Sequence, residues 1–436
     1  MKDYLGGIMM ASQIQEIKKN PIAAGLVVLF ILPPLGMLWF VILGISEWLD
    51  VKNKREMPTD MVSMLFILMM LASAGATMIN LQPDYLLSTL MIGGYLSIYL
   101  YFLHHPDYLH LRQYLWITIF GGIYIYFSEK IFDLFSFTSP AGKVVALMTG
   151  HFLFGYMKHD RLFGSAFNPN YACYLLILAL SFLLVEFLRA IRFRDNKRIS
   201  VSLILLAILD LGIYETGSRA GFVIMLLLHL LFLFKWNKRW FITAAVATVL
   251  FSPSIYQWMP RSDDTGVSMD KRLEIWKTSL HIIAEHPVFG ATSFGFRDDY
   301  VRLTGHAIPH AHDLFLAVFS ISGVICGLFF IAIVMISGYR LIRLQMKAGN
   351  NSYYADLFLF SLPTIIAYGL MDFELSSPQI LIIVFGLLSF WSRYMKRMRG
   401  VAPSYHFQMK YSAKRRQVPG ERRSKATSIH SLKDSL

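Results

Sequence analysis

The chain has 436 residues, of which 55% are hydrophobic and only 16% are charged, a balance that excludes an ordinary soluble protein of this size. Its formal net charge is +13, and residues 393–436 supply +10 of it, with twelve Lys or Arg against two acids. A basic segment directly after a last apolar run is typical of a cytoplasmic tail against anionic lipid. We therefore expect an integral membrane protein with no nucleic-acid partner.

Eleven apolar segments follow one another along the chain, most of them close to the ~20 residues that cross a bilayer core. They cover residues 21–45, 61–80, 84–104, 112–128, 170–189, 199–215, 220–235, 240–258, 314–339, 355–371 and 378–392. The sequence thus predicts an all-α, polytopic integral membrane protein with about 11–12 transmembrane helices. The predicted parts are an N-terminal segment (1–20), a multi-span membrane domain (21–392) and a basic cytoplasmic tail (393–436).

The first apolar segment does not fit a single crossing, because Lys18–Lys19 and Lys52–Arg55 on its two sides both look cytoplasmic. Pro33 and Pro34 interrupt it, and paired prolines break a helix. Two tilted or re-entrant halves would resolve the conflict and give twelve crossings in effect. The alternative is a single span with its N-terminus outside. We favour the two halves.

Basic clusters between the later segments indicate how the chain is oriented. Lys and Arg concentrate at alternate loops, which the positive-inside rule places in the cytoplasm. The remaining segments should then lie outside, and they are 129–169, Glu215–Arg219, 259–313 and Asp372–Pro378. The unusual polar residues of the chain gather in these four segments.

The long outer loop, residues 259–313, contains a predicted amphipathic helix. In DKRLEIWKTSLHIIAEHPVFG, residues Leu273, Trp276, Leu280 and Ile283 recur at helical spacing, and a proline and a glycine end the run. We expect this helix to lie on the membrane domain. Arg272 is a solvated charge on the plainest interpretation, but a cation near a helix N-terminus is unfavourable and favours an anionic partner.

Three histidines stand just before the next span, at His306, His310 and His312. They could be loop residues without a function. A metal site is a second interpretation, although the spacing matches no HExxH or CxxC pattern. The third is that one neutral histidine accepts a proton from an attacking hydroxyl. His312 is placed best for that role, since it lies where the loop enters the helix.

Arg219 lies at the outer start of an apolar run, in the motif TGSRAG. The N-terminus of a helix adds backbone donors and a positive dipole, and the guanidinium fork suits phosphate. Gly217 and Gly221 would let a bulky headgroup approach the backbone. The alternatives are an arginine that snorkels to the interface or one that pairs with Glu215.

Other polar residues carry weaker signals. Asn168 and Asn170 in FNPNY indicate first a turn and a helix start, although their amides could also bond sugar hydroxyls. Asp210 lies inside an apolar run, where a carboxylate is costly, and its partner is not readable. Cys173 and Cys326 lie in apolar stretches and are expected to be small buried side chains.

Taken in order, these motifs resemble a known family. FNPNY and TGSRAG at span starts, RLEIW and EHPVFG in a long outer loop, and HAHD before SGVICGL resemble the O-antigen ligase and O-antigen polymerase superfamily of bacterial membrane glycosyltransferases. The resemblance covers most of residues 160–335 in motif order, and the other spans match in general architecture only. Each motif alone is weak, whereas their order and topology together are specific.

The resemblance implies a metal-independent enzyme without a cofactor, multi-pass in the cytoplasmic (inner) membrane of a bacterium. It would transfer a glycan from an undecaprenyl-pyrophosphate carrier to an acceptor hydroxyl at the outer face. Family arginines hold the diphosphate, a role that falls to Arg219 and, less directly, to Arg272. The family histidine before the post-loop helix corresponds to His312, as base or acceptor-positioning group. The other predicted substrate-binding residues are Ser218, Asn170, His310 and Asp313.

Two positions depart from the family pattern. Asp313 stands where Asn, Ser or Gln commonly follows the histidine, and Cys326 stands where a second glycine is usual. Asp313 could orient and strengthen His312 as a base, or it could mark a different acceptor.

Several functional hypotheses remain, and the first two differ in the acceptor. A polysaccharide polymerase, whose acceptor is another lipid-linked glycan, is slightly favoured over a ligase, whose acceptor is lipid or protein. Membrane lipid is an expected partner, and a chain-length regulator is a further candidate. A transporter or flippase is the rival class, but its polar groups should lie near mid-membrane, whereas Arg219, Arg272 and His312 are expected at one surface. A structural assembly subunit is the third class.

Overall fold

A computed structural model of the protein describes residues 20–51, 60–132, 139–149, 161–348 and 352–398. Within these ranges the regular structure consists of helices, without strands. The predicted N-terminal segment, apart from its last residue, and most of the predicted tail lie outside the described residues. The all-α prediction is confirmed.

Every one of the eleven predicted apolar segments coincides with a helix or a broken pair of helices. The first half of the chain contains α2 (Pro21–Ile31), α3 (Pro33–Val51), α4 (Met61–Asn80), η1 (Pro83–Tyr85), α5 (Leu86–His104), η2 (Pro106–Tyr108), α6 (Leu111–Phe132) and α7 (Pro140–Thr149). The second half contains η3 (Gly164–Ala166), α9 (Pro169–Arg192), α10 (Asn196–Glu215), α11 (Arg219–Trp236), α12 (Lys238–Leu250), α13 (Ser252–Trp258), η4 (Ser262–Asp264), α14 (Thr265–Glu285), α15 (Thr292–Thr304), α16 (Leu314–Ala348), α17 (Tyr353–Gly369), η6 (Glu374–Ser376) and α18 (Pro378–Met398).

Six of the described helices are long and apolar enough to cross a membrane, judged by length and composition. The number becomes seven if α12 and α13, which meet at an angle of 75°, form one broken span. The remaining predicted segments form helices that are shorter or more polar. The fold is therefore that of a polytopic membrane protein, and the total of 11–12 crossings stays a prediction.

The predicted break at Pro33–Pro34 is present. Leu32 has φ −134° and ψ 75°, outside the helical region, and it separates α2 from α3. The two helices then lie against each other, since the Trp39 indole donates to the Pro21 carbonyl at 3.0 Å. A helix of 11 residues is only about 16 Å long, so α2 is too short to cross a bilayer core of ~30 Å. The broken segment is a helical hairpin.

Helix α9 is the centre of the bundle. Within its candidate span 94% of the residues are buried, and α6, α10, α11 and α17 all pack on it. Among its contacts, the ring of Tyr174 on α9 packs edge to face against the ring of Tyr368 on α17. Because α9, α11 and α17 pack together, their ends bring distant loops into contact.

One end of these three helices holds an ionic cluster. The Asp356 carboxylate, 1% exposed, meets Lys235 Nζ at 2.8 Å and Arg192 Nη1 at 2.7 Å. Both cations lie in the last turns of their helices, next to loops that the sequence assigns to the cytoplasm. The other ends of the same helices hold the starts of α9 and α11 and the end of α17, which belong to segments expected outside.

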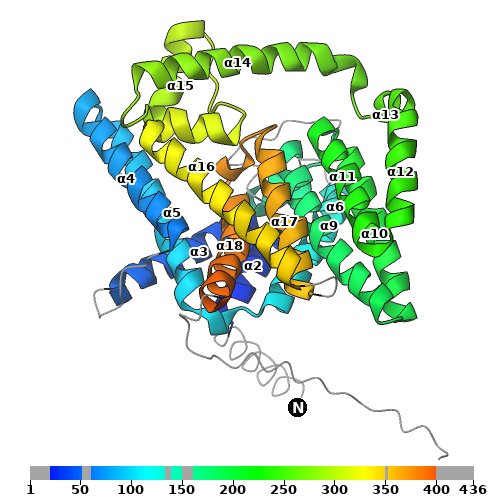
Figure 1. Ribbon diagram of the computed structural model, residues 1–436. Coiled ribbons are helices and arrows are strands. Elements are labelled where there is room, and N and C mark those ends of the chain that lie inside the picture. The colour runs from blue at the N-terminus through cyan, green and yellow to red at the C-terminus, as the bar shows by residue number, and fades with distance from the viewer. Residues whose placement is uncertain (1–19, 52–59, 133–138, 150–160, 349–351, 399–436) are drawn as a thin grey trace, which may run out of the picture. The chain divides into compact units, whose positions relative to one another are not determined.

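Helices α14 and α15 of the long loop run across the end of the bundle at which α11 and α16 begin (Figure 1). The predicted amphipathic helix is confirmed, but its buried face is not the predicted one. Ile275 and Ile282 are buried against the bundle, whereas Leu273 and Leu280 are 42% and 57% exposed. Helical spacing alone had singled out the side of the helix that carries Leu273 and Leu280. In the structure α14 packs on α16, and the side that carries Ile275 and Ile282 is buried instead.

Two glycines attach this loop to α16. Gly323 has φ +82° at a kink inside α16, and Val324 N–H donates to the Pro287 carbonyl at 2.8 Å. A Cβ at Gly323 would lie 2.2 Å from the carbonyl oxygen of Val288, and a Cβ at Gly290 would lie 2.4 Å from the Ile321 carbonyl carbon. Only glycine allows this backbone contact and this conformation.

Replacing Gly323 with alanine is expected to destabilise the protein by about 1–3 kcal/mol, because the new methyl group meets backbone and the residue keeps a positive φ. Gly338→Ala on the same helix is the matched control, since nothing lies within 4 Å of its added Cβ and alanine favours a helix there. Thermal unfolding in detergent measures both. Equal melting temperatures for the two variants would contradict the docking role of Gly323.

Candidate functional site

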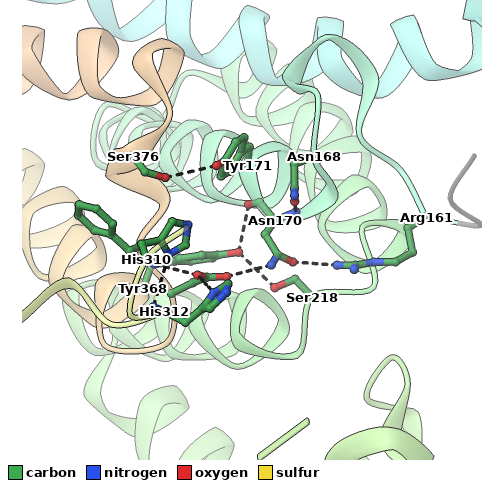
Figure 2. Close-up of polar contacts among 11 residues, drawn as sticks. Arg161, Asn168, Asn170, Tyr171, Ser218, His310, His312, Tyr368 and Ser376 are labelled. Atoms are coloured by element: carbon green, nitrogen blue, oxygen red, sulfur yellow. Dashed lines mark hydrogen bonds and ion pairs between the residues drawn. The ribbon is translucent and has the colours of Figure 1, made fainter. Parts of the chain in front are cut away.

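His312 lies close to Asn170, Ser218 and Arg161, which come from other segments of the chain (Figure 2), and its imidazole contacts Asp372. His312 Nδ1 lies 2.7 Å from Asp372 Oδ1. The carboxylate is 6% exposed and the imidazole 30% exposed. With Nδ1–H donating to the carboxylate, Nε2 keeps its lone pair and can accept a proton. An imidazole held by a buried carboxylate is the arrangement of a general base.

A chain of hydrogen bonds continues from Asp372 to an arginine. Asn170 Nδ2 donates to Asp372 Oδ2 at 2.9 Å, and Arg161 Nη2 donates to Asn170 Oδ1 at 2.8 Å. Asn168 begins α9 by accepting from Asn170 N–H at 2.8 Å. Asn170 thus links the His312–Asp372 pair to Arg161 by hydrogen bonds.

The backbone at His312 is strained. Its φ is +50°, which costs a residue other than glycine of order 1–3 kcal/mol and is found mostly at functional sites. His312 N–H donates to His310 Nδ1 at 3.4 Å, so this nitrogen of His310 carries no proton. Burial, followed by the neighbouring His312, lowers the pKa of His310 to about 4. His310 is therefore neutral at pH 7 and supports the position of His312.

The low pKa of His310 predicts a pH-dependent stability. The unfolded chain takes up this proton near pH 6.5 and the folded protein only near pH 4, so stability is complete above pH 6.5 and falls as the pH decreases toward 4. The loss is roughly 3 kcal/mol at most. His310→Gln should show a smaller fall in melting temperature over this range than the wild type. An unchanged pH dependence would contradict the prediction.

Ser218 caps the helix that begins at Arg219. Its Oγ accepts from Gly221 N–H at 3.3 Å and lies 3.2 Å from the Tyr368 hydroxyl, which donates to the Asn170 carbonyl at 3.2 Å. Gly221 packs on α9, because an added Cβ would lie 2.0 Å from Cys173 Sγ. The prediction that Gly221 gives a ligand access to the backbone is therefore wrong, since helix packing uses that space.

Three arginines surround the start of α11. Arg161 Nε donates to the Thr216 carbonyl at 2.6 Å, and its stem covers Gly217, whose Cβ would lie 3.0 Å from Nε. Arg219 Nη1 donates to the Arg261 carbonyl at 3.0 Å. Burial lowers the pKa of the Arg161 guanidinium, and the positive charges of Arg261 and Arg219 lower it further. Cations that raise one another's energy at a helix N-terminus favour an anionic ligand.

Residues 201–331, from α10 through the long loop into α16, match the sequence model of the O-antigen ligase family. Over these residues the chain is similar to that family. No curated protein matches the chain. The predicted resemblance to the O-antigen ligase and polymerase superfamily is confirmed.

The match supports an O-antigen ligase- or polymerase-type function in general, that of a glycosyltransferase-like enzyme with a lipid-linked glycan donor and an acceptor. Together with the apolar helices, it supports a multi-pass protein of the bacterial inner membrane. Arg219, Arg272 and His312 all lie within the matched residues. Asn170 and Arg161, which complete the hydrogen-bonded network, lie before them.

The remaining predicted residues are placed as follows. Within the described residues, no hydrogen bond or ion pair connects Arg272, half-buried on α14, to the network around His312. Asp313 caps α16, since its Oδ1 accepts from Leu316 N–H at 2.8 Å, and burial raises its pKa. The proposal that Asp313 orients His312 is corrected, because Asp372 occupies that position.

Two further polar residues have partners that the sequence did not reveal. Glu215 pairs with Lys130 at 2.7 Å, which corrects the alternative of a local Glu215–Arg219 pair. Asp210 on α10 meets His229 of α11 at 3.3 Å, so this carboxylate joins two helices away from the His312 network.

Arg161 and Asp372 belong to the hydrogen-bonded network but were not among the predicted site residues. Each had one usable signal, a charged side chain in a segment already predicted to lie outside. Neither belongs to the motifs that carry the family resemblance, and their partners come from other segments.

The site also contains a set of metal-binding atoms. His310, His312 and Asp372 each offer one ligand atom, and these atoms lie within 4.8 Å of one another. Two imidazoles and a carboxylate are a common zinc-binding set. The direct contact between His312 and Asp372 equally fits a metal-free base, and metal independence stays a prediction.

Proposed function

We propose that the protein transfers a glycan from an undecaprenyl-pyrophosphate carrier to an acceptor hydroxyl at the outer face of the inner membrane. The observation that supports this most is the His312–Asp372 pair next to the arginine-lined start of α11. A base and an anion-binding region lie within one hydrogen-bonded network, as a displacement at a glycosyl phosphate requires. The family match supports the same class of reaction.

In the proposed step the acceptor oxygen attacks the anomeric carbon of the donor glycan. A carbon–oxygen bond to the acceptor forms, and the bond to the diphosphate breaks with its electron pair leaving on the phosphate oxygen. His312 Nε2 takes the acceptor proton, and Asp372 stabilises the resulting imidazolium. Arg161 and Arg219 neutralise the diphosphate as its charge grows. The anomeric configuration inverts in such a single displacement.

The position of the network favours transfer over transport. A transporter is expected to hold its polar groups near mid-membrane at broken helices, whereas the His312 network is built from helix ends and loops. Among acceptors, a second lipid-linked glycan, as in a polymerase, is the slightly favoured choice. Lipid or protein acceptors, as in a ligase, use the same donor chemistry.

The test is transfer by the purified protein in detergent, with an undecaprenyl-pyrophosphate oligosaccharide as donor and with EDTA in one arm. Products that lengthen without an added acceptor indicate a polymerase, and transfer only after lipid or protein is added indicates a ligase. Activity that persists with EDTA supports the metal-free mechanism, and its loss would contradict that mechanism. A donor that binds but is never consumed would overturn the proposal.

A further inference from the structure

A second polar cavity lies away from the His312 network, between η1 and the α14–α15 turn. Its volume is about 150 Å³, and its lining residues are Asn80, Gln82, Tyr85, His286, Ala291 and Asp299. Two amides, a phenol, an imidazole and a carboxylate thus surround a space in which only one lining residue is aliphatic. Such a lining offers donors and acceptors in several directions and disfavours an apolar ligand.

We infer that this cavity binds one hydroxylated sugar ring of the glycan substrate. Each ring hydroxyl can donate one hydrogen bond and accept others, which amide and carboxylate groups satisfy from both sides. The side chains come from two segments far apart in sequence, and the α15 wall is held firmly. The inference rests on the proposed transfer for its biological ligand, and binding of a sugar to the cavity can be measured without it.

The polar walls are fixed by a contact between two lining residues and by contacts with residues outside the cavity. Asp299 Oδ2 lies 2.9 Å from His286 Nε2, and Asp299 Oδ1 lies 3.0 Å from Arg302 Nη2. Gly295 lets the Tyr85 ring pack on α15, because an added Cβ would lie 3.0 Å from two ring carbons. A fixed set of polar groups binds a ligand with a smaller loss of conformational entropy.

A metal ion is the competing ligand for part of this cavity. Glu285, His286 and Asp299 place one ligand atom each within 4.8 Å of one another. Arg302, however, contacts both carboxylates, so a cation would have to displace a guanidinium that already neutralises them. The charge balance therefore favours a neutral, hydroxylated ligand.

The cavity is connected to the reaction site through α16. Ala291 N–H donates to the Ser320 carbonyl at 2.8 Å, and Ser320 lies two turns into the helix that His312 precedes. Ala291 and Ala311 also belong to one buried cluster with Phe296 and Ala317. A glycan that extends from the reacting hydroxyl along this end of the bundle would meet the cavity with a later sugar unit.

The first experiment is ligand-observed saturation-transfer NMR with a panel of methyl glycosides of hexoses and N-acetylhexosamines at millimolar concentration. The wild type should transfer saturation to at least one glycoside. Asn80→Ala combined with Gln82→Ala should weaken that binding by about fivefold or more, since two hydrogen bonds are lost. Gln82→Trp, which fills the cavity from an exposed position, should abolish it, and Arg297→Gln on the exposed side of α15 should not. Binding by no glycoside, or equal binding by all variants, would overturn the inference.

The second arm uses the transfer assay to separate the two sources of the sugar. A rise in the acceptor KM alone in Asn80→Ala/Gln82→Ala assigns the cavity to the acceptor, and a rise in the donor KM alone assigns it to the donor glycan. An unchanged KM for both contradicts a role in this substrate. Glycoside binding by a wild type that shows no transfer would reject the proposed function and keep the cavity, so the two failures are distinguishable.

Discussion

Replacing His312 with alanine is expected to slow glycan transfer by about 10²- to 10⁴-fold, the usual contribution of a positioned general base. The acceptor hydroxyl would then lose its proton to water instead of to an imidazole aligned by Asp372. Donor binding should change little, because the arginines around the start of α11 remain. Single-turnover rates, with donor affinity measured in parallel, separate the two effects.

His306→Ala is the matched control, since it removes an exposed histidine from the same loop. Asp372→Asn keeps the shape of the partner and removes its charge, so the rate should fall, because an uncharged partner no longer stabilises the imidazolium that forms during proton transfer. An active His312→Ala protein, with rates like those of His306→Ala, would rule out His312 as the base.

Arg161→Ala is expected to lower kcat/KM for the donor by about 10²- to 10³-fold, an amount typical of a lost charge-stabilising group. The guanidinium both faces the cationic region and holds Asn170, so its loss removes charge and loosens the network. Arg161→Lys should recover part of the activity, because an ammonium restores the charge but not the two separate contacts to Thr216 and Asn170.

Arg198→Ala controls for a general effect of removing positive charge, because Arg198 is exposed at the start of α10. The readout that distinguishes a binding role from a purely structural one is the affinity for undecaprenyl pyrophosphate without a glycan. Arg161→Ala should weaken it, as should Arg219→Ala. Unchanged affinity, together with a normal melting temperature, would remove Arg161 from the diphosphate site.

Much of the fold could be predicted from sequence because its signals are local. An apolar run of spanning length encodes a helix without reference to the rest of the chain, and two adjacent prolines encode the break at Leu32. The alternation of basic loops also predicted which segments share an end of the bundle. That is why the segments of His312, Arg219 and Asn170, expected on one side, meet in the structure.

The rest depends on tertiary packing and left no readable pattern. Asp372 is one of two acids in a short turn, and the packing of α17 on α9 brings it to His312 and Asn170. Asp313 was predicted to orient His312 because the two residues are adjacent in sequence. An acid at the start of a helix, however, accepts hydrogen bonds from that helix's own N–H groups. On α14, helical spacing predicted that Leu273 and Leu280 are buried, whereas contact with the bundle buries Ile275 and Ile282 instead.

The cluster at Asp356 has a consequence for how the chain enters the membrane during synthesis. Its cations, Arg192 and Lys235, belong to helices that are synthesised before α17. Both positive charges are therefore already present when the Asp356 carboxylate of α17 enters the bundle. A buried carboxylate without a partner costs several kcal/mol, so we expect α17 to be more stable in a bundle in which α9 and α11 are already packed together. The order of synthesis thus favours α17 joining a bundle whose earlier helices are already correctly packed.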